Sequence, residues 1–363
     1  MTLIDFGHLS SRILHTAVSQ VNPKVDKSTG KFDTQEWSSM YVHLLFKNLS
    51  YLKMKFEQEY GELVICIDSK NNWRKLVYPD YKGKRKKSRD ESKIDYESFY
   101  VLQDEIINEI RANFPFRVIE VDRAEADDIV GVLARTYAPL EKTVVISSDK
   151  DFKQVIEYGC KLFDPINKVF INMTKDELKE WKIDHILSGD DIDNIPNIKQ
   201  GTEFTPEFRK FLADEGVYKD IPVEEFLELK ISQHLFDKFD IYEVIPSGKL
   251  KGQFRDTKKI FKRIPFGDKG RYTFAKDLKG NLLENPMYLK HFKRNQELVL
   301  FDYIPQDITD TIIKDYNEAE SHFDTAGIMN LFSKYHCMDL MKSVSDFFQV
   351  AKQQPRTGVS EWA

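Results

Sequence analysis

Cysteine is scarce in this sequence, and the few cysteines form no recognisable pattern. The chain has Cys66, Cys160 and Cys337, an odd number without a Cys-x-x-Cys pair. This excludes a disulfide framework and a cysteine zinc site, and it is typical of a protein from a reducing compartment. We therefore expect a cytoplasmic protein.

Long apolar runs are also missing. No stretch of about 18 apolar residues occurs, and the first ten residues, MTLIDFGHLS, carry no basic segment ahead of an apolar one. We expect neither a membrane span nor a secretion signal. With 41% hydrophobic and 13% aromatic residues, the chain can still bury a core, which excludes a wholly disordered protein.

Positive charge shows no overall excess, because 54 Lys and Arg stand against 59 Asp and Glu and give a formal net charge of -5. Taken alone, this figure argues against a nucleic-acid-binding protein. The distribution reverses that argument. Residues 70–93 hold ten Lys and Arg against three Asp and Glu, and residues 246–296 hold fourteen against four, so the rest of the chain carries -22. Two positive segments on an acidic body indicate that a polyanion binds at one face.

The first 165 residues alternate short apolar runs with helical patterns, which predicts an α/β fold with a mostly parallel sheet and helices on both faces. The expected strands are 2–4, 63–67, 116–121 and 143–147. Asp33 is expected to cap a long amphipathic helix that contains Trp37 and Tyr41, and Thr174 and Glu177 form a capping box.

The alternation of expected strands and helices ends near residue 188. We expect an α/β domain over 1–188 and a mostly helical C-terminal domain over 189–347. A flexible tail is expected over 348–363.

Carboxylates follow every expected strand. Asp5 and Asp68 come after the first two strands, and Asp149 and Asp151 after the fourth. The third strand leads to a helix start that carries Glu125, Asp127 and Asp128. One such Asp is most often a helix N-cap, but four strand ends share one edge of a parallel sheet, so these side chains should converge. Converging carboxylates need cations, and oxygen-only donors indicate Mg²⁺ or Mn²⁺.

A further acidic cluster lies at residues 190–193. Asp190 and Asp193 are three apart and would share one face of a helical turn, whereas Asp191 points elsewhere. Alone, the cluster reads as a polar turn between helices. Together with the strand-end group it supplies enough carboxylates for two metal ions about 4 Å apart, the arrangement that catalyses phosphoryl displacement in nucleases and polymerases.

The ordered motifs LIDF, CID, YKGKRKK, EADD, SSDKD and SGDDIDN resemble the structure-specific 5' nuclease, or flap endonuclease, superfamily, and most closely the T-even bacteriophage ribonucleases H. The resemblance covers residues 2–347. It implies a PIN-like fold and a Mg²⁺-dependent 5'-to-3' exonuclease and flap endonuclease that uses two metal ions, with Mn²⁺ as a substitute. It also implies RNA primer removal during replication, 5'-phosphate products and, for a phage protein, the host cytoplasm.

The resemblance also assigns residues. One metal site would draw on Asp5, Asp68, Glu125, Asp127 and Asp149, and the other on Asp128, Asp151, Asp190 and Asp193. Residues 73–93 would form a basic arch over the site, in which Lys82 and Arg85 reach the scissile phosphate. The DNA-binding residues would be Arg74, Lys75, Tyr81, Lys84, Lys86 and Lys87, with Tyr81, Tyr78 or Trp73 stacking on unpaired bases. A flexible charged linker is the alternative interpretation of this segment.

The implied partners are branched or nicked duplex DNA and RNA–DNA hybrid, bound by a monomer. A sliding clamp or a single-strand-binding protein is a candidate partner of the C-terminal helix, although no motif identifies one. The family's glycine pair for a potassium-binding hairpin is missing after SGDDIDN, so duplex binding is expected at 246–296, where Lys and Arg alternate with Phe and Tyr. A solvated surface with scattered aromatic residues is the alternative interpretation of this segment.

Two alternative functions predict different sequence features. A catalytically silent DNA-binding protein of the same fold should have lost strand-end carboxylates, whereas every motif is filled here. A small ribonuclease of the PIN toxin type would lack the basic arch and the pair Asp190 and Asp193.

Overall fold

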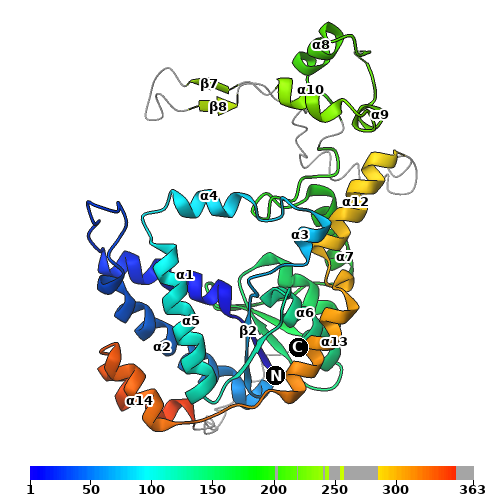
Figure 1. Ribbon diagram of the computed structural model, residues 1–363. Coiled ribbons are helices and arrows are strands. Elements are labelled where there is room, and N and C mark those ends of the chain that lie inside the picture. The colour runs from blue at the N-terminus through cyan, green and yellow to red at the C-terminus, as the bar shows by residue number, and fades with distance from the viewer. Residues whose placement is uncertain (201–202, 219, 240–241, 245–253, 257–284, 349–363) are drawn as a thin grey trace. The chain divides into compact units, whose positions relative to one another are not determined.

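The computed structural model describes residues 1–200, 203–218, 220–239, 242–244, 254–256 and 285–348. These residues fall into two compact units, each of which is described by itself. The larger unit comprises Met1–Pro79, Gly83–Leu178 and the residues from Leu300 onward; the smaller comprises Asp80–Lys82 and Lys179–Val299. Figure 1 shows the elements of both.

A six-stranded sheet of order β3-β2-β1-β4-β5-β6 lies at the centre of the larger unit. The strands are β1 (Thr2–Asp5), β2 (Leu63–Ile67), β3 (Arg117–Glu120), β4 (Val144–Ile146), β5 (Lys161–Asp164) and β6 (Val169–Ile171). All pairs are parallel except β5 with β6. The four expected strands are confirmed to within one residue at each end, whereas β5 and β6 were not expected.

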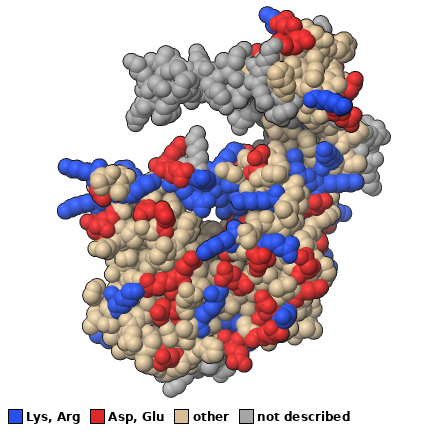
Figure 2. Space-filling model, in the orientation of Figure 1, with Lys and Arg blue, Asp and Glu red and all other residues tan. Residues whose placement is uncertain are grey.

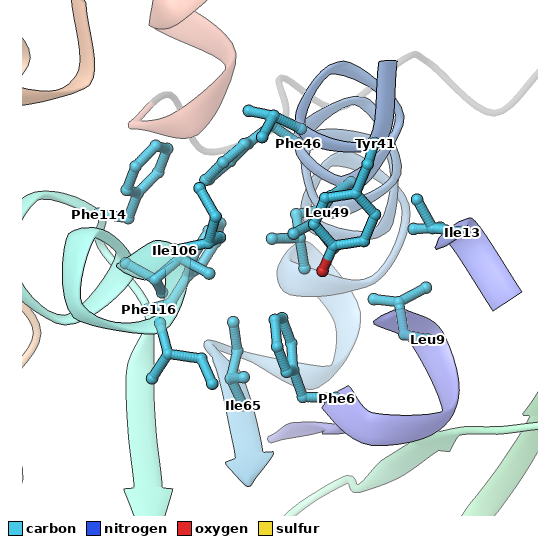
Figure 3. Close-up of a cluster of buried hydrophobic side chains, with 14 of the residues drawn as sticks. Phe6, Leu9, Ile13, Tyr41, Phe46, Leu49, Ile65, Ile106, Phe114 and Phe116 are labelled. Carbon is cyan, nitrogen blue, oxygen red and sulfur yellow. The ribbon is translucent and has the colours of Figure 1, made fainter. Parts of the chain in front are cut away.

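Helices cover both faces of this sheet. On one face lie α1 (Phe6–Val21), α2 (Thr34–Tyr60), α5 (Tyr96–Asn113) and α14 (Thr325–Lys334); on the other lie α6 (Ala126–Tyr137), η1 (Lys150–Tyr158) and α13 (Gln306–Glu318). Because successive strand residues point to opposite faces, Ile4 and Ile65 pack in the first core, whereas Leu3 and Val64 pack in the second. Figure 3 shows part of the first core.

Local capping fixes where two of the expected helices begin. The Asp33 carboxylate accepts the Gln35 N–H at the start of α2. Thr174 and Glu177 form the expected reciprocal capping box before α7 (Lys175–Ser188). Trp37 and Tyr41 of α2 are fully buried, as their spacing predicts.

The chain from Leu300 onward packs against the larger unit, which differs from the expected C-terminal domain over 189–347. Phe301 and Ile308 join the core with α6, and Ile328 and Phe332 join the core with α2 and α5. These segments include η2 (Phe301–Tyr303), α15 (Met338–Lys342) and η3 (Val344–Phe347). The end of the alternation between strands and helices in the sequence indicates where the sheet ends, but it does not indicate where later amphipathic helices pack.

The smaller unit is mostly helical. Besides most of α7, it contains α8 (Pro206–Asp214), α9 (Val223–Leu227), α10 (Ser232–Phe239), α12 (Pro286–Val299) and the hairpin of β7 (Tyr242–Val244) with β8 (Phe254–Asp256). Phe208, Phe226 and Phe239 form the centre of one core. Most of the basic segment 246–296 and nearly all of the expected tail lie outside the described residues. No helix of the described chain is long and apolar enough to cross a membrane.

Candidate active site

Two strand-end carboxylates meet over the first turn of α1. Asp5 ends β1 and accepts the His8 N–H at 2.9 Å, and Asp68 follows β2 and accepts the Ala126 N–H at 2.8 Å. A methyl group on Gly7 would lie 2.6 Å from Asp68 Oδ2 and 3.6 Å from Asp5 Oδ1. The absent side chain at Gly7 therefore leaves room for both carboxylates at the carboxyl edge of the sheet.

The buried thiol of Cys66 in β2 is influenced by a third carboxylate, that of Asp127. Burial raises the pKa of Cys66 well above its ordinary value, and the negative charges of Asp5, Asp127 and Asp68 raise it further. Such effects weaken with distance. The charges of Asp5 from β1, Asp68 after β2 and Asp127 from α6 thus all act on one buried sulfur atom.

The loop after β4 reaches the same edge. Asp149 donates its N–H to Ser147 Oγ at 3.1 Å, and its carboxylate accepts the Asp151 N–H at 3.0 Å at the start of η1. Burial lowers the pKa of His8 on α1, and the charge of Asp149 acts against this effect. The charge of Asp149 therefore acts on a residue of the first turn of α1.

Asp164, at the end of β5, is a carboxylate that the sequence interpretation missed. It is 7% exposed, and its oxygens accept hydrogen bonds from Ser148 Oγ at 2.6 Å, the Ile166 N–H at 2.8 Å and the Asn167 side-chain amide at 2.6 Å. Burial alone would raise the pKa of Asp164, but these bonds lower it. The turn sequence Asp-Pro-Ile-Asn after the apolar pair Leu162-Phe163 is the signal that could have revealed both the strand and its Asp.

A buried ion pair joins the start of the basic segment to the start of α6. The Arg74 guanidinium donates to Asp128 Oδ1 at 2.7 Å, to Asp128 Oδ2 at 3.0 Å and to Glu125 Oε2 at 3.0 Å. Trp73 Nε1 and the Glu125 N–H also donate to Asp128 Oδ2. Arg74 is 2% exposed and Asp128 is 0% exposed.

These contacts differ from three expectations. Arg74 was expected to bind DNA and Trp73 to stack on bases, but both side chains are buried against α6. Asp128 was expected to bind metal, but its two oxygens are engaged by Arg74, Trp73 and a backbone N–H. In the structure, Asp128 instead holds Arg74 beside Glu125.

The rest of the expected arch contains the short helices α3 (Arg74–Val77) and α4 (Lys84–Asp90). Figure 2 shows Lys and Arg side chains gathered along α4. Exposed cations of the segment include Lys75, Lys84, Arg85 and Lys86, and Lys87 also belongs to α4. At the far end of α4, Lys31 Nζ donates to the Asp90 carbonyl at 2.9 Å. The arch is thus tied at both ends to residues of the larger unit.

In the smaller unit, residues 80–82 contact the acidic turn at 190–195. Lys82 donates its N–H to the Asp193 carbonyl at 2.8 Å, its Nζ lies 3.8 Å from Asp193 Oδ2, and Tyr81 donates its hydroxyl to the same carboxylate at 3.1 Å. Tyr81 is 3% exposed, which differs from the expectation that it stacks on unpaired bases.

The segment 190–195 is a turn and not the expected helical turn. Asp190 pairs with Ile195 as an antiparallel bridge, and its carboxylate accepts the N–H groups of Ile192 and Asp193. Gly189 begins the turn at φ 67°, where an added Cβ would lie 2.3 Å from the Ile195 carbonyl oxygen. Asp191 is exposed, as expected.

Comparison with known proteins places this geometry in a family. The N-terminal resolvase-like domain of 5'-3' exonucleases matches residues 1–182, and the C-terminal domain of T4 RNase H matches residues 273–347. The chain belongs to the 5'-3' exonuclease family. It is accordingly a metal-dependent 5' nuclease with a PIN-type fold.

Individual proteins and one solved structure are similar to this chain. The ribonuclease H of Enterobacteria phage T4 is 27% identical over 307 residues, which span 81% of this chain and 85% of the relative. The flap endonuclease Xni of Shewanella woodyi is 23% identical over 56% of this chain and 83% of its own. Among solved structures, the bacteriophage T5 D15 flap endonuclease in a pseudo-enzyme-product complex with DNA and metal ions is 17% identical, with a TM-score of 0.48 over 87% of this chain and 97% of that chain.

Proposed function

We propose that this 5' nuclease is a Mg²⁺-dependent 5'-to-3' exonuclease and flap endonuclease. Its substrates are nicked or branched duplex DNA and RNA–DNA hybrid, it removes RNA primers during replication, and its products carry 5'-phosphates. The proposal is supported above all by the family match over residues 1–182, in which the strand-end carboxylates lie.

The donor set fits hard divalent cations. Asp5, Asp68 and Asp127 present only oxygen ligands, and no described cysteine is exposed beside them. Backbone N–H groups of His8 and Ala126 orient two of these carboxylates before any ligand binds. Two bound Mg²⁺ ions would activate a water and neutralise charge on the phosphate under attack.

The chain's own cations have separate tasks in this proposal. Arg85 on α4 is exposed and faces the backbone phosphates of the substrate strand. Lys82 stabilises charge that develops on the scissile phosphate. Arg74 holds Glu125, and with it the first turn of α6 that carries Asp127.

A cleavage assay tests the function. Flap, nicked and RNA-primed duplexes with a 5' label are incubated with the protein in Mg²⁺ or in EDTA, and product lengths separate exonuclease from flap endonuclease action. Asp149→Asn should nearly abolish cleavage and leave DNA binding largely intact. Asp104→Asn, the same change at an exposed α5 residue, should cleave like the wild type.

Two results would contradict the proposal. Near-normal turnover by Asp149→Asn would contradict the proposed two-metal mechanism. Tight DNA binding by the wild type without cleavage in Mg²⁺ would favour the alternative, a catalytically silent DNA-binding protein of the same fold.

A further inference from the structure

A pocket lies between α1 and α2 of the larger unit, apart from every site residue assigned above. It has a volume of 160 Å³ and is lined by Arg12, Ile13, Thr16, Leu44 and Asn48. A cavity of about 150 Å³ holds a benzene-sized guest, so this space admits a phosphate-sized group.

Arg12 is the one charged residue of the lining, and its guanidinium is incompletely bonded. Nε is buried and has no hydrogen-bond partner within the described chain. Nη2 donates to Asn48 Oδ1 at 3.4 Å, which is long for a hydrogen bond. Because a guanidinium stays charged and offers five donors, a half-buried one whose buried Nε has no acceptor favours an anion.

The chain itself supplies no carboxylate that pairs with Arg12 in the described residues. Burial lowers the pKa of Arg12, and the charge of Asp164 opposes this effect. The Asp164 oxygens are already bonded by Ser148, Ile166 and Asn167. The guanidinium therefore remains available to an external acceptor.

The position of the pocket relates it to the cleavage site. Arg12 follows Asp5, the N-cap of α1, by seven residues, or about 10 Å along the helix axis. A duplex strand places one phosphate every 3.4 Å of axis, so this length corresponds to about three nucleotides. His8, one turn before Arg12, is influenced by the charges of both Asp149 and Arg12. In the view of Figure 1, α4 runs above α1.

We propose that this pocket binds a backbone phosphate of the substrate strand, about three nucleotides from the cleaved bond, and that Arg12 is the donor. The inference rests on the proposed 5' nuclease function, since it places the phosphate in a substrate strand. It adds a contact that lies outside the basic arch and outside the carboxylate group.

Binding measured without cleavage tests this subsite. Full-length protein is titrated with fluorescent flap DNA in EDTA at several salt concentrations. Arg12→Gln should weaken binding about tenfold whatever the sequence. It should also make the slope of log affinity against log salt shallower by about 0.9 for a duplex contact or 0.7 for a single-strand contact. Arg12→Lys should retain most of the slope.

Two further variants separate a lost contact from a damaged fold. Asn48→Asp puts a carboxylate against Arg12 and should reproduce the Arg12→Gln result while the helices stay packed. Lys142→Gln removes an exposed charge just before β4, at the opposite edge of the sheet, and should change neither affinity nor slope. An unchanged slope in both pocket variants, or an equal loss in Lys142→Gln, would overturn the proposal.

Neutral methylphosphonates placed singly along the strand then locate the contact. One position near the third nucleotide should weaken wild-type binding, and the same position should have no added effect in Arg12→Gln. Additive losses at every position would reject the subsite. Stabilisation of the wild-type protein by inorganic phosphate without this coupling would also overturn the proposal, because it would identify a pocket for a free anion only. If wild-type protein neither binds nor cleaves flap DNA, the proposed function itself fails; if it does both and the pocket variants match it, only the subsite fails.

Discussion

The buried pair of Arg74 and Asp128 predicts a large loss of stability when one partner is removed. In Arg74→Met, the Asp128 carboxylate, with a side chain 0% exposed, loses two hydrogen bonds, and Glu125, 7% exposed, loses one. Removing one partner of a buried ion pair costs about 3–5 kcal/mol, because the other charge stays buried without compensation. The expected fall in melting temperature is roughly 6–20 °C for a unit of this size.

Chemical denaturation measures this loss, and a neighbouring pair provides the control. Arg123 donates to Asp307 with both side chains exposed, so Arg123→Met should change the unfolding free energy little. The double variant Arg74→Met with Asp128→Leu should cost less than the sum of the two single changes, since it removes both charges. A loss in Arg74→Met no larger than in Arg123→Met, or additive losses, would refute the reasoning.

The same variant decides between two roles for Arg74. A DNA-binding residue contributes to the salt dependence of binding because it displaces counterions from phosphates. A guanidinium engaged inside the fold does not. Arg74→Met, assayed well below its melting temperature, should keep the wild-type salt slope, and a shallower slope would restore the DNA-binding role.

Three other outcomes follow from the structure. The pKa of Asp164 is lowered in the fold, so its stabilisation is present above the unfolded value near 3.9 and is lost as pH falls through the folded value. The unfolding free-energy difference between wild type and Asp164→Asn, measured in urea, should therefore shrink below about pH 4, and a constant difference would contradict this. Burial raises the pKa of Cys160 to about 12 and of Cys337 to about 11, and it raises the pKa of Cys66 as well. The native protein should therefore not react rapidly with a disulfide reagent at pH 8, whereas the unfolded protein should titrate three thiols. Mg²⁺ at 100 times its dissociation constant for the wild type should raise the unfolding free energy by about 2.7 kcal/mol in wild type and Asp104→Asn. The same Mg²⁺ concentration should raise it by less in Asp149→Asn, and an equal gain in all three proteins would argue against Asp149 as a ligand.

The sheet edge could be predicted from sequence because its signals are local. Each expected strand is a short apolar run that acidic residues follow within a few positions, and parallel strands bring such ends to one edge. Asp5, Asp68 and Asp127 accordingly act together on Cys66. The strand β5 was missed because Leu162 and Phe163 form too short an apolar run to stand out.

The roles of residues in the basic segment could not be predicted in the same way. A run of Lys and Arg reveals charge, but it does not reveal which side chain finds a carboxylate far away in the sequence. Arg74 contacts Asp128 across 54 positions, and Tyr81 contacts Asp193 across 112. Only the folded chain brings these partners together.

The count of ten cations in residues 70–93 therefore overstates the charge that this segment offers to phosphate. Arg74 is engaged by Asp128, and Arg89 donates to the Tyr100 hydroxyl at 2.6 Å. Among the described side chains, the exposed cations of the segment are Lys70, Lys75 and Lys93, together with Lys84, Arg85 and Lys86 of α4. Because the salt dependence of DNA binding follows phosphate contacts and not formal charge, the contribution of this segment to the wild-type slope should correspond to fewer contacts than the segment has cations. Arg12 would add a contact from the part of the chain whose net charge is negative.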